Sequence, residues 1–339
     1  MPAPRSTLHI VSNADENFFP GLAVAVASAV AAASGECDYR FLILDGGLKS
    51  GAMARLADTI GSIGGRKGIQ ATLEPLSVDQ SRLEILPARR GSRMHYAKLL
   101  LPEILSDLDS IVYLDADVLC FHGLEEVRPT GGEPQWLLAG ALDFFDTLEK
   151  DCPWLDELSP AERRMPYINT GVMWMNLKGL REVDFTNRAI AARAAVGTAR
   201  HADQAVFNFL CRGKSFLLPD AINHRTSIGS TRPLCAGDLD LNLHHIGMPK
   251  PWLGPPKTSN WLAHQLWHQA SAALFPGMLS TPKDAPPHDL GSIRRKAMLY
   301  ALLNPKRAAH YRSDLQSLHD PSGILEIAAR HWSFTSDNL

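Results

Sequence analysis

The alternation of short β-branched runs with longer Ala- and Leu-rich stretches constrains the fold of this chain most strongly. Strands are predicted at Thr7–Ser12 and Tyr39–Leu44, and a predicted helix follows each of them, at Pro20–Ala33 and Ser50–Ile60. This strand–helix–strand–helix order is typical of a parallel sheet that is covered by helices. The first third of the chain is therefore predicted to be a doubly wound α/β unit.

The alternation continues through the middle of the chain and stops near Trp252. A helix around His95–Ile104 is predicted to precede a strand at Ile111–Leu114. The later predicted elements are strands at Trp136–Leu142, Ile168–Asn176 and Leu241–Ile246, and helices at Gly179–Ala195 and Asp203–Cys211. The breakers Gly254-Pro255-Pro256 and Pro282–Pro287 follow, and Ser292–Trp332 is again helical. We expect a catalytic domain over residues 1–252 and a helical, partly basic extension over residues 253–339.

Composition excludes several classes of protein. The 339 residues carry a formal net charge of −2, which predicts no general attraction to nucleic acid. The five cysteines are widely spread and lack metal-ligand spacing, so a disulfide framework or zinc site is not expected. We therefore expect the protein to act in a reducing, cytoplasmic compartment. The apolar stretch Phe18–Gly35 follows two acidic residues and is short, so it is predicted to be a buried helix rather than a signal peptide or membrane span.

The predicted strand at Ile111–Leu114 ends in two carboxylates, Asp115 and Asp117, which only Ala116 separates. Open α/β sheets bind ligands at the carboxyl ends of their strands, and oxygen ligands there suit a divalent cation that neutralises a diphosphate. The alternative is a solvated Asp turn, which would be favoured for an isolated Asp-x-Asp. The motifs further along the chain favour the cation site.

A second motif begins at His244, beside a predicted strand end, and continues through Gly247 to Lys250. An imidazole can join two carboxylates around a metal, and a Lys can bind a phosphate as a point charge. Glycine allows the backbone to approach a ligand closely. A lone His is usually structural and a lone Lys is usually solvated, but together with the upstream Asp-x-Asp the pattern is far more specific.

Three more polar clusters lie where elements are predicted to begin or end. Asp15 and Asn17 follow the first strand, where a base and ribose would bind, although the glycine fingerprint of dinucleotide folds is absent. Asn169 opens an apolar strand and offers donors and acceptors that suit sugar hydroxyls. Asp203 and Gln204 open a helix. Helix capping is the alternative role for Asp15 and for Asp203.

In combination these motifs resemble glycosyltransferase family 8, the retaining, nucleotide-sugar-dependent enzymes that include bacterial lipopolysaccharide galactosyl- and glucosyltransferases and glycogenin. The resemblance runs in order from Thr7 to Trp252 and ends in the family signature His-x-x-Gly-x-x-Lys-Pro-Trp. It implies a single GT-A-type, doubly wound mixed sheet with a Rossmann-like nucleotide-binding half, followed here by a helical appendage. It also implies transfer of a hexose, galactose or glucose, from a UDP-sugar to a saccharide or glycolipid acceptor such as lipopolysaccharide.

The resemblance assigns roles to individual residues. Asp115, Asp117 and His244 are the implied ligands of Mn²⁺, with Mg²⁺ as the alternative ion. Contacts with the donor are implied for Asp15, Asn17, Lys98, Asp115, Ala116, Asp117, Asp143, Gly247 and Lys250, with Asp143 toward the acceptor side. Asn169, Asp203 and Gln204 are the implied catalytic residues near the donor sugar.

The chain departs from the family at two positions. Lys98 stands where the family commonly has Arg, and a Lys cannot make the two-pronged contact of a guanidinium. Ala205 stands where the family often has a second Asp after Gln204, so that role is not carried over. Because an amide is a poor nucleophile, a covalent intermediate on Gln204 is not favoured. The favoured mechanism is attack by the acceptor on the same face of the sugar from which the diphosphate leaves.

Two rival functions come from other classes of protein. A haloacid-dehalogenase-type phosphohydrolase also places Asp-x-Asp after an apolar strand, and Asp115 would be its nucleophile. A non-catalytic sugar-nucleotide-binding protein would lack a complete metal site.

The tail interleaves basic residues with apolar ones. Either it rests on the anionic inner face of a membrane or it packs on the core, and the sequence leaves both open. The basic residues are Arg294, Arg295, Lys296, Lys306, Arg307 and Arg312, and the apolar ones are Ile293, Met298, Leu299, Tyr300, Leu302 and Leu303.

Overall fold

A computed structural model describes most of the chain. The described residues are 5–88, 92–126, 128–129, 135–196, 202–226, 240–254, 261–276, 290–305, 307–309, 311–312, 315, 328 and 331–332. Several features of the sequence lie outside the described residues. They are the predicted spacer Pro282–Pro287, Pro255 and Pro256 of the predicted chain break, and the residues His201 and Lys306.

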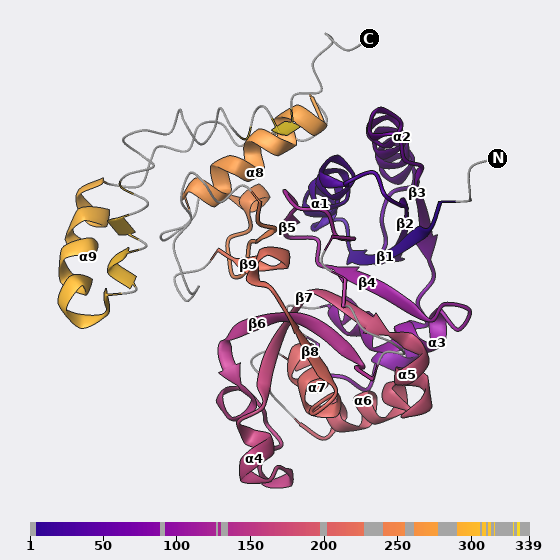
Figure 1. Ribbon diagram of the computed structural model, residues 1–339, viewed down its shortest axis with the longest axis vertical. Coiled ribbons are helices and arrows are strands. Elements are labelled where there is room, and N and C mark those ends of the chain that lie inside the picture. The colour runs from indigo at the N-terminus through magenta and orange to yellow at the C-terminus, as the bar shows by residue number, and fades with distance from the viewer. Residues whose placement is uncertain are drawn as a thin grey trace.

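A seven-stranded mixed sheet forms the centre of the molecule, in the order β3-β2-β1-β4-β7-β6-β8 (Figure 1). Strands β1 to β4 pair in parallel, and β7 runs antiparallel to both β4 and β6. A small second sheet has the order β5-β10-β9. The strands are β1 (Thr7–Ala14), β2 (Asp38–Asp45), β3 (Ala71–Leu76), β4 (Ser110–Leu114), β5 (Val118–Leu119), β6 (Leu138–Thr147), β7 (Pro166–Asn176), β8 (Ser215–Leu218), β9 (His224–Arg225) and β10 (Leu243–His244).

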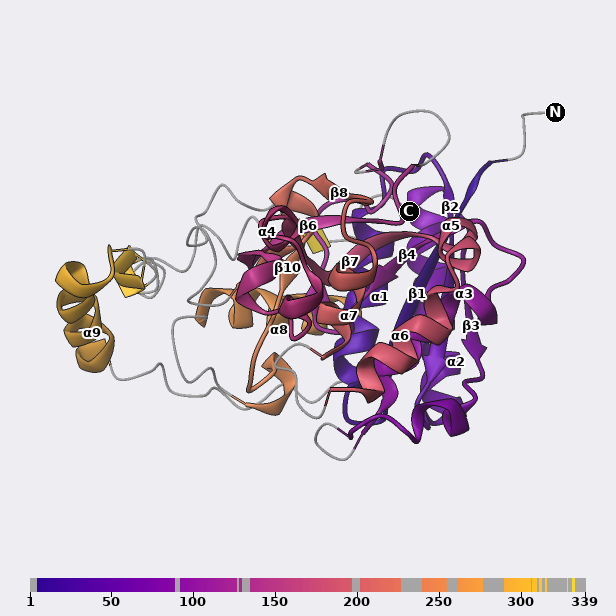
Figure 2. The ribbon, with the colours of Figure 1, turned by 90° about the horizontal axis from the view of Figure 1, so that it is seen from below.

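Helices cover both faces of the sheet, as Figures 1 and 2 show. One face packs against α1, α2 and α8, and the other against α3, α5, α6 and α7. None of the described helices is long and apolar enough to cross a membrane. The helices are α1 (Phe19–Ala32), α2 (Ser50–Lys67), α3 (Leu101–Ile104), α4 (Pro160–Arg163), α5 (Leu177–Glu182), α6 (Phe185–Ala194), α7 (Ala202–Leu210), α8 (Trp261–Leu274) and α9 (Leu290–Leu303), and the short 3-10 segments include η2 (Met94–Leu100) and η5 (Asp220–Ile222).

The two hydrophobic cores follow from the alternation of side chains along the central strands. Successive residues of a strand point to opposite faces, so a strand that is apolar throughout feeds both cores. Ile10 and Val112 contribute to the core under α1 and α2, whereas Val11 and Tyr113 contribute to the core over α5 to α7. The apolar runs that predicted buried strands are therefore explained by burial on both sides.

The order of the strands marks the end of the sheet between β1 and β4 as the expected place for a ligand-binding crevice. The chain moves outward from β1 to β2 and β3, and then returns to form β4 on the opposite side of β1. Doubly wound sheets bind ligands at such a reversal, outside the carboxyl ends of the strands. Asp15 directly follows β1 and Asp115 directly follows β4, so both residues lie at this end.

The predicted α/β fold is confirmed. Sequence analysis missed the two edge strands of the large sheet, and also the two-residue strands β5 and β9 of the small sheet. At one edge, β3 includes Pro75, a residue that is tolerated on edge strands because one side of their backbone pairs with no strand. At the other edge, β8 exposes Phe216 and Leu217. Neither segment has the long apolar run that identifies a central strand.

Three predicted elements differ in the structure. The helix predicted at Gly179–Ala195 is wrong as one element, because Asp184 adopts a left-handed backbone (φ 51°) and separates α5 from α6. The region His95–Ile104 is 3-10 helix in η2 before it becomes α-helix in α3, since Pro102 cannot donate a hydrogen bond to an earlier turn. The strand predicted at Leu241–Ile246 is only the two-residue β10.

The segment after Trp252 does not form a separate layer in its described part. Helix α8 packs on α1, and its Trp267 is 2% exposed within the same core as Leu22. Trp332 belongs to this core too and packs against Phe121, with their ring centroids 5.0 Å apart. Helix α9 projects from the body of the molecule together with the described residues around Tyr311, whose ring stacks on Tyr300 (Figure 1). A domain boundary at residue 252 remains a prediction.

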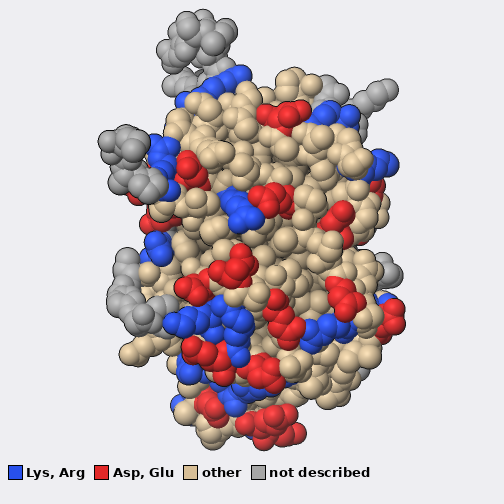
Figure 3. Space-filling model, turned by 90° about the vertical axis from the view of Figure 1, so that its right-hand side faces the viewer, with Lys and Arg blue, Asp and Glu red and all other residues tan. Residues whose placement is uncertain are grey.

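Charged side chains are mixed on the surface. Figure 3 shows Lys and Arg interspersed with Asp and Glu over the face that carries β3 and α2, in agreement with the net charge of −2.

Candidate active site

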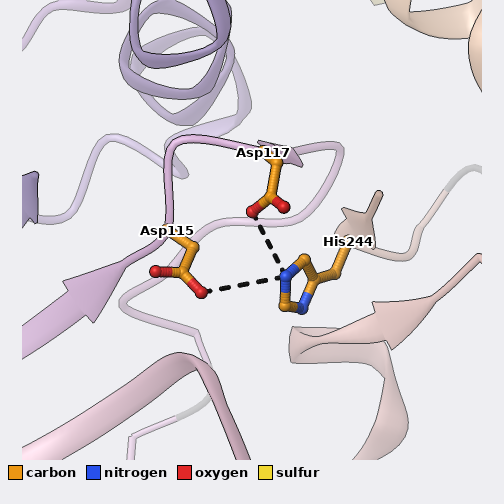
Figure 4. A group of neighbouring side chains, drawn as sticks. All are labelled: Asp115, Asp117 and His244. Atoms are coloured by element: carbon orange, nitrogen blue, oxygen red, sulfur yellow. Dashed lines mark ion pairs between the residues drawn. The ribbon is translucent and has the colours of Figure 1, made fainter. Parts of the chain in front are cut away.

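Asp115, Asp117 and His244 come together at the crevice (Figure 4). The Nε2 atom of His244 lies 3.8 Å from a carboxylate oxygen of Asp115 and 3.2 Å from one of Asp117. One ligand atom from each of the three residues lies within 4.8 Å of the others. This is the cluster that the Asp-x-Asp and His-x-x-Gly-x-x-Lys motifs predict.

Backbone pairing brings these distant segments together. The N–H of Asp115 donates to the carbonyl of Gly171 on β7 at 2.7 Å, which ties the Asp turn to the main sheet. His244 pairs with Val118 across β10 and β5, and the N–H of His245 donates to the carbonyl of Asp117 at 2.9 Å. The small second sheet therefore holds the His motif against the Asp turn.

The cluster has the chemistry of a divalent cation site. The Nδ1 atom of His244 lies 3.0 Å from the amide oxygen of Asn223, which leaves Nε2 directed at the two carboxylates. Burial raises the pKa of Asp115 and the neighbouring Asp117 carboxylate raises it further, although the Lys98 ammonium opposes both effects. Two carboxylate oxygens and an imidazole nitrogen are ligands that suit Mn²⁺, and the oxygens suit Mg²⁺.

Lys250 is buried beside the same cluster. Its ammonium forms an ion pair with Asp117 and donates to the carbonyl of His245 at 2.8 Å. Burial alone would raise the pKa of Asp117, but Lys250 and His244 outweigh it and hold this pKa well below its usual range. The turn between His244 and Lys250 contains Gly247 with φ 86°, a backbone conformation that favours glycine.

Trp252, at the end of the signature, anchors it to the start of α1. Its indole N–H donates to the carbonyl of Asn17 at 2.9 Å, and its ring meets Phe18 edge-on. Gly21 makes this packing possible, because a Cβ there would lie 2.3 Å from the Trp252 ring and 2.5 Å from the carbonyl oxygen of Ala116. Asn17 and Ala116 thus both line the junction of the two motifs.

Asp143, Asn169 and Gln204 form a second buried polar cluster. The carboxylate of Asp143 accepts hydrogen bonds from Asn169 Nδ2 at 2.7 Å, Gln204 Nε2 at 3.2 Å and the N–H of Phe145 at 3.0 Å. The amide oxygen of Gln204 accepts from the N–H of Thr170 at 3.1 Å. Both ends of the Gln204 amide are therefore held in place.

Lys98 and Asp203 form a buried ion pair between these two clusters. Their Nζ and Oδ2 atoms are 2.5 Å apart, and the ammonium also reaches Thr170 Oγ1 at 3.3 Å and the ring of Tyr113. Burial by itself would raise the pKa of Asp203, but Lys98 outweighs it and lowers this pKa to about 2. Asp203 lies in the first turn of α7, and Lys98 is the partner of its carboxylate.

Asp15 forms a turn just before α1 and does not cap it, because Phe18 is at the N-cap and makes no side-chain cap hydrogen bond. Its carboxylate accepts from the N–H of Asn17 at 3.0 Å and of Phe18 at 3.1 Å, in the turn that leads into α1. A contact with the base or ribose stays a prediction for Asp15 and Asn17. Ala205, the second departure from the family, is fully buried in the core over α5 to α7.

Sequence reasoning missed Asn223 and the packing role of Gly171. A Cβ on Gly171 would lie 2.1 Å from Cε1 of His244, so only glycine leaves room for the ring. No motif identifies Asn223, which precedes a two-residue strand. The one sequence signal for the role of Gly171 was its position directly after Asn169 and Thr170.

Comparison with known proteins gives a consistent result. Residues 9–254 match the sequence profile described as Glycosyl transferase family 8. The chain is 25% identical over 256 residues to a lipopolysaccharide 1,2-glucosyltransferase of Escherichia coli K12, with 72% of each chain covered. It is 27% identical over 274 residues to a probable galacturonosyltransferase-like 10 of Arabidopsis thaliana, covering 73% of this chain and 72% of the other.

A solved structure has a similar fold and a similar level of identity. The galactosyltransferase LgtC, crystallised in complex with donor and acceptor sugar analogs, superposes with a TM-score of 0.61. The two sequences are 25% identical, and the match covers 82% of this chain and 98% of the other.

Replacing Gly171 with Ala should displace the His244 ring and weaken cation binding by about tenfold or more, the usual effect of disturbing the support of a metal ligand. Mn²⁺ affinity, measured by calorimetry with UDP present, tests this expectation. Gly61→Ala is the matched control, because a Cβ at Gly61 meets nothing within 4 Å in helix α2. An unchanged Mn²⁺ affinity in Gly171→Ala would contradict the assignment of His244 as a ligand.

Replacing Lys98 with Met should lower the free energy of unfolding by about 3 to 5 kcal/mol at pH 7, because it leaves the Asp203 carboxylate buried without its ion-pair partner. The wild-type pKa of Asp203 is depressed to about 2, so the contribution of the pair is complete above about pH 4 and is lost as pH falls through 2. Urea unfolding at pH 7 and pH 5 measures the loss.

The loss in Lys98→Met should be smaller at pH 5, because burial raises the pKa of an unpaired Asp203 and protonation then removes the charge. Lys49→Met is the control. Its exposed pair with Glu16, with a nitrogen–oxygen distance of 3.3 Å, should contribute about 0 to 1 kcal/mol. Equal losses of unfolding free energy in Lys98→Met and Lys49→Met would show that the buried Lys98–Asp203 pair stabilises the protein no more than an exposed pair does.

Proposed function

The chain belongs to glycosyl transferase family 8, and we propose that it transfers a hexose, galactose or glucose, from a UDP-sugar to a saccharide acceptor, with retention of the anomeric configuration. The acceptor is proposed to be lipopolysaccharide or another cell-surface glycan. The observation that carries the proposal is the cluster of Asp115, Asp117 and His244 at the point where the sheet reverses its strand order. The names of the lipopolysaccharide glucosyltransferase and the galactosyltransferase LgtC support the choice of donor and acceptor.

The residues of the cluster account for the departure of the nucleoside diphosphate. Asp115, Asp117 and His244 would hold Mn²⁺, or Mg²⁺ in its place, and the ion when bound supplies Lewis-acid stabilisation of the leaving diphosphate. Lys250 adds a second positive charge at the same place, and its buried position strengthens its attraction to a phosphate. With these charges, departure of the diphosphate needs no separate strong acid.

The second cluster would position the donor sugar. Asn169, Asp143 and Gln204 present fixed donors and acceptors next to the cation site, and Asp203 adds a carboxylate that Lys98 keeps ionised. Because both ends of the Gln204 amide are hydrogen-bonded and an amide is a weak nucleophile, we favour a positioning role for Gln204. The acceptor would then attack from the face that the diphosphate leaves, and the diphosphate would take its proton.

The two rival functions are not supported. The interpretation as a haloacid-dehalogenase-type phosphohydrolase is wrong, because residues 9–254 match a glycosyltransferase family. The match begins within β1 and extends beyond the His motif. A non-catalytic binding protein would not require the cluster of two carboxylates and an imidazole, which is complete in this chain.

Helix α9 is proposed to hold the enzyme at an anionic membrane face on the cytoplasmic side. It exposes Met298 (68%), Leu299 (58%), Leu302 (92%) and Leu303 (71%), next to a basic run that starts at Arg294. Apolar residues beside basic ones are typical of helices that lie in a membrane interface. Such an anchor would bring the crevice to an acceptor that is itself carried by a lipid.

Replacing Asp117 with Asn should reduce transfer and donor hydrolysis by at least about 100-fold, because the amide keeps the shape of the side chain but removes a charged ligand. Release of UDP in the presence of Mn²⁺, measured over UDP-galactose and UDP-glucose, tests the cation site and also identifies the donor. Asp58→Asn, an exposed carboxylate on α2, is the control. Turnover of a folded Asp117→Asn at a near wild-type rate would refute the site.

Replacing Leu302 and Leu303 together with Ser should reduce binding to anionic liposomes by about tenfold or more, because it removes the two most exposed apolar side chains of α9. Flotation of both proteins at low and high salt measures the effect. Deletion of the whole tail is a poorer test, since Trp332 is part of the core. Equal flotation of the double variant and the wild type, with transfer to a soluble acceptor unchanged in both, would rule out α9 as the anchor.

A further inference from the structure

A chain of buried side-chain hydrogen bonds connects the two polar clusters. It runs from Asp143 to Asn169 (2.7 Å), from Asn169 to Asn223 (2.8 Å) and from Asn223 to His244 (3.0 Å). The four residues are at most 5% exposed, and Asn223 is completely buried. Asn223 has no part in the function proposed above.

The direction of the hydrogen bonds is set at Asn169. A backbone N–H can only donate, and an ionised carboxylate can only accept. Because the N–H of Gly171 donates to Asn169 Oδ1 at 3.0 Å, this oxygen is fixed as the acceptor end of the amide. Because the other end meets the Asp143 carboxylate, Asn169 Nδ2 is fixed as the donor.

The same reasoning fixes the donor and the acceptor of the next two hydrogen bonds, as far as His244. Asn169 Oδ1 accepts, so the atom of Asn223 that faces it must be the donor Nδ2. The oxygen of the Asn223 amide then faces Nδ1 of His244 and can only accept. Nδ1 must therefore carry a proton. Nε2 faces the carboxylates of Asp115 and Asp117, so it holds a proton when the ring is positively charged and a lone pair, available to a cation, when the ring is neutral.

We propose that Asn223 is a positioning residue that locks His244 in the Nδ1–H tautomer, so that Nε2 is ready to bind a divalent cation. The inference rests on the proposed cation site. The ring is fixed in two ways, because Asn223 sets its proton and Gly171 packs against its face. Partners of this kind are known to orient metal-binding imidazoles and to set their tautomer.

The tautomer can be observed directly in the wild-type protein without any metal or donor. The ¹⁵N shifts of the two ring nitrogens, recorded by long-range ¹H–¹⁵N correlation above the pH at which imidazole protonates, distinguish the Nδ1–H from the Nε2–H form. Subtracting the spectrum of His244→Gln assigns the signals. The proposal requires the Nδ1–H form, and an Nε2–H form in the wild type would overturn it.

Variants of Asn223 test whether this residue is the cause. Asn223→Leu removes the acceptor, so His244 should lose the pure Nδ1–H form, and Mn²⁺ affinity with UDP present should fall about 10- to 100-fold. Asn223→Asp keeps an acceptor toward Nδ1 and should retain the tautomer. Asn208→Ala, which removes another buried amide that bonds Ile168 and not His244, should leave the tautomer unchanged.

A tautomer that stays the same in Asn223→Leu would refute the role of Asn223, whatever happens to the stability of that variant. Because the tautomer is read without donor or metal, its result is independent of the transfer assay. Absence of hexose transfer together with an Nδ1–H His244 would overturn the proposed function and leave the positioning role standing.

Discussion

Two carboxylates on one turn, Asp117 buried and Asp115 partly exposed, repel each other, and the buried lysines around them offset that repulsion. Asp115 and Asp117 are separated by one residue, and burial disfavours the charge of each. Lys250 neutralises Asp117 directly, while Lys98 lies near Asp115 through its pair with Asp203. A divalent cation would complete this compensation.

The same requirement explains the long-range architecture. The positive groups come from η2 and from the signature after β10, and the imidazole comes from β10 itself. Trp252 then fastens the signature to the start of α1, where Gly21 allows the approach. The first and the last part of the family match are thereby in direct contact beside Asp115 and Asp117.

The sequence was most informative where a single pattern decides a feature. The strands β1 and β4 are apolar on both faces, and Asp-x-Asp follows β4 directly, so the central sheet and the two carboxylates could be predicted. The edge strands β3 and β8 lack such a pattern, because β3 contains Thr72, Glu74 and Pro75 and β8 is only four residues long. The break between α5 and α6 depends on the backbone of one residue, Asp184, whose side chain gives no such signal.

The clustering of Asp115, Asp117 and His244 was predictable from the sequence, and the contacts that support these residues were not. His244 and Lys250 belong to a spaced signature, whereas Asn223 acts through a partner 21 positions away in the sequence. The sequence analysis noted only that Lys98 cannot make the two-pronged contact of an Arg. In the structure Lys98 forms an ion pair with Asp203 and a hydrogen bond to Thr170. Pairings of this kind are set by how the elements pack, so no local pattern reveals them.

The position of β10 between β5 and β9 has a consequence for the synthesis of the chain. A growing polypeptide that has folded as far as β8 already has both carboxylates, but it lacks His244, Lys250 and the strand that pairs with β5. Contacts between residues so far apart in sequence form late, because the intervening chain must first be ordered. More than two thirds of the protein must therefore be synthesised before Asp115, Asp117 and His244 can come together.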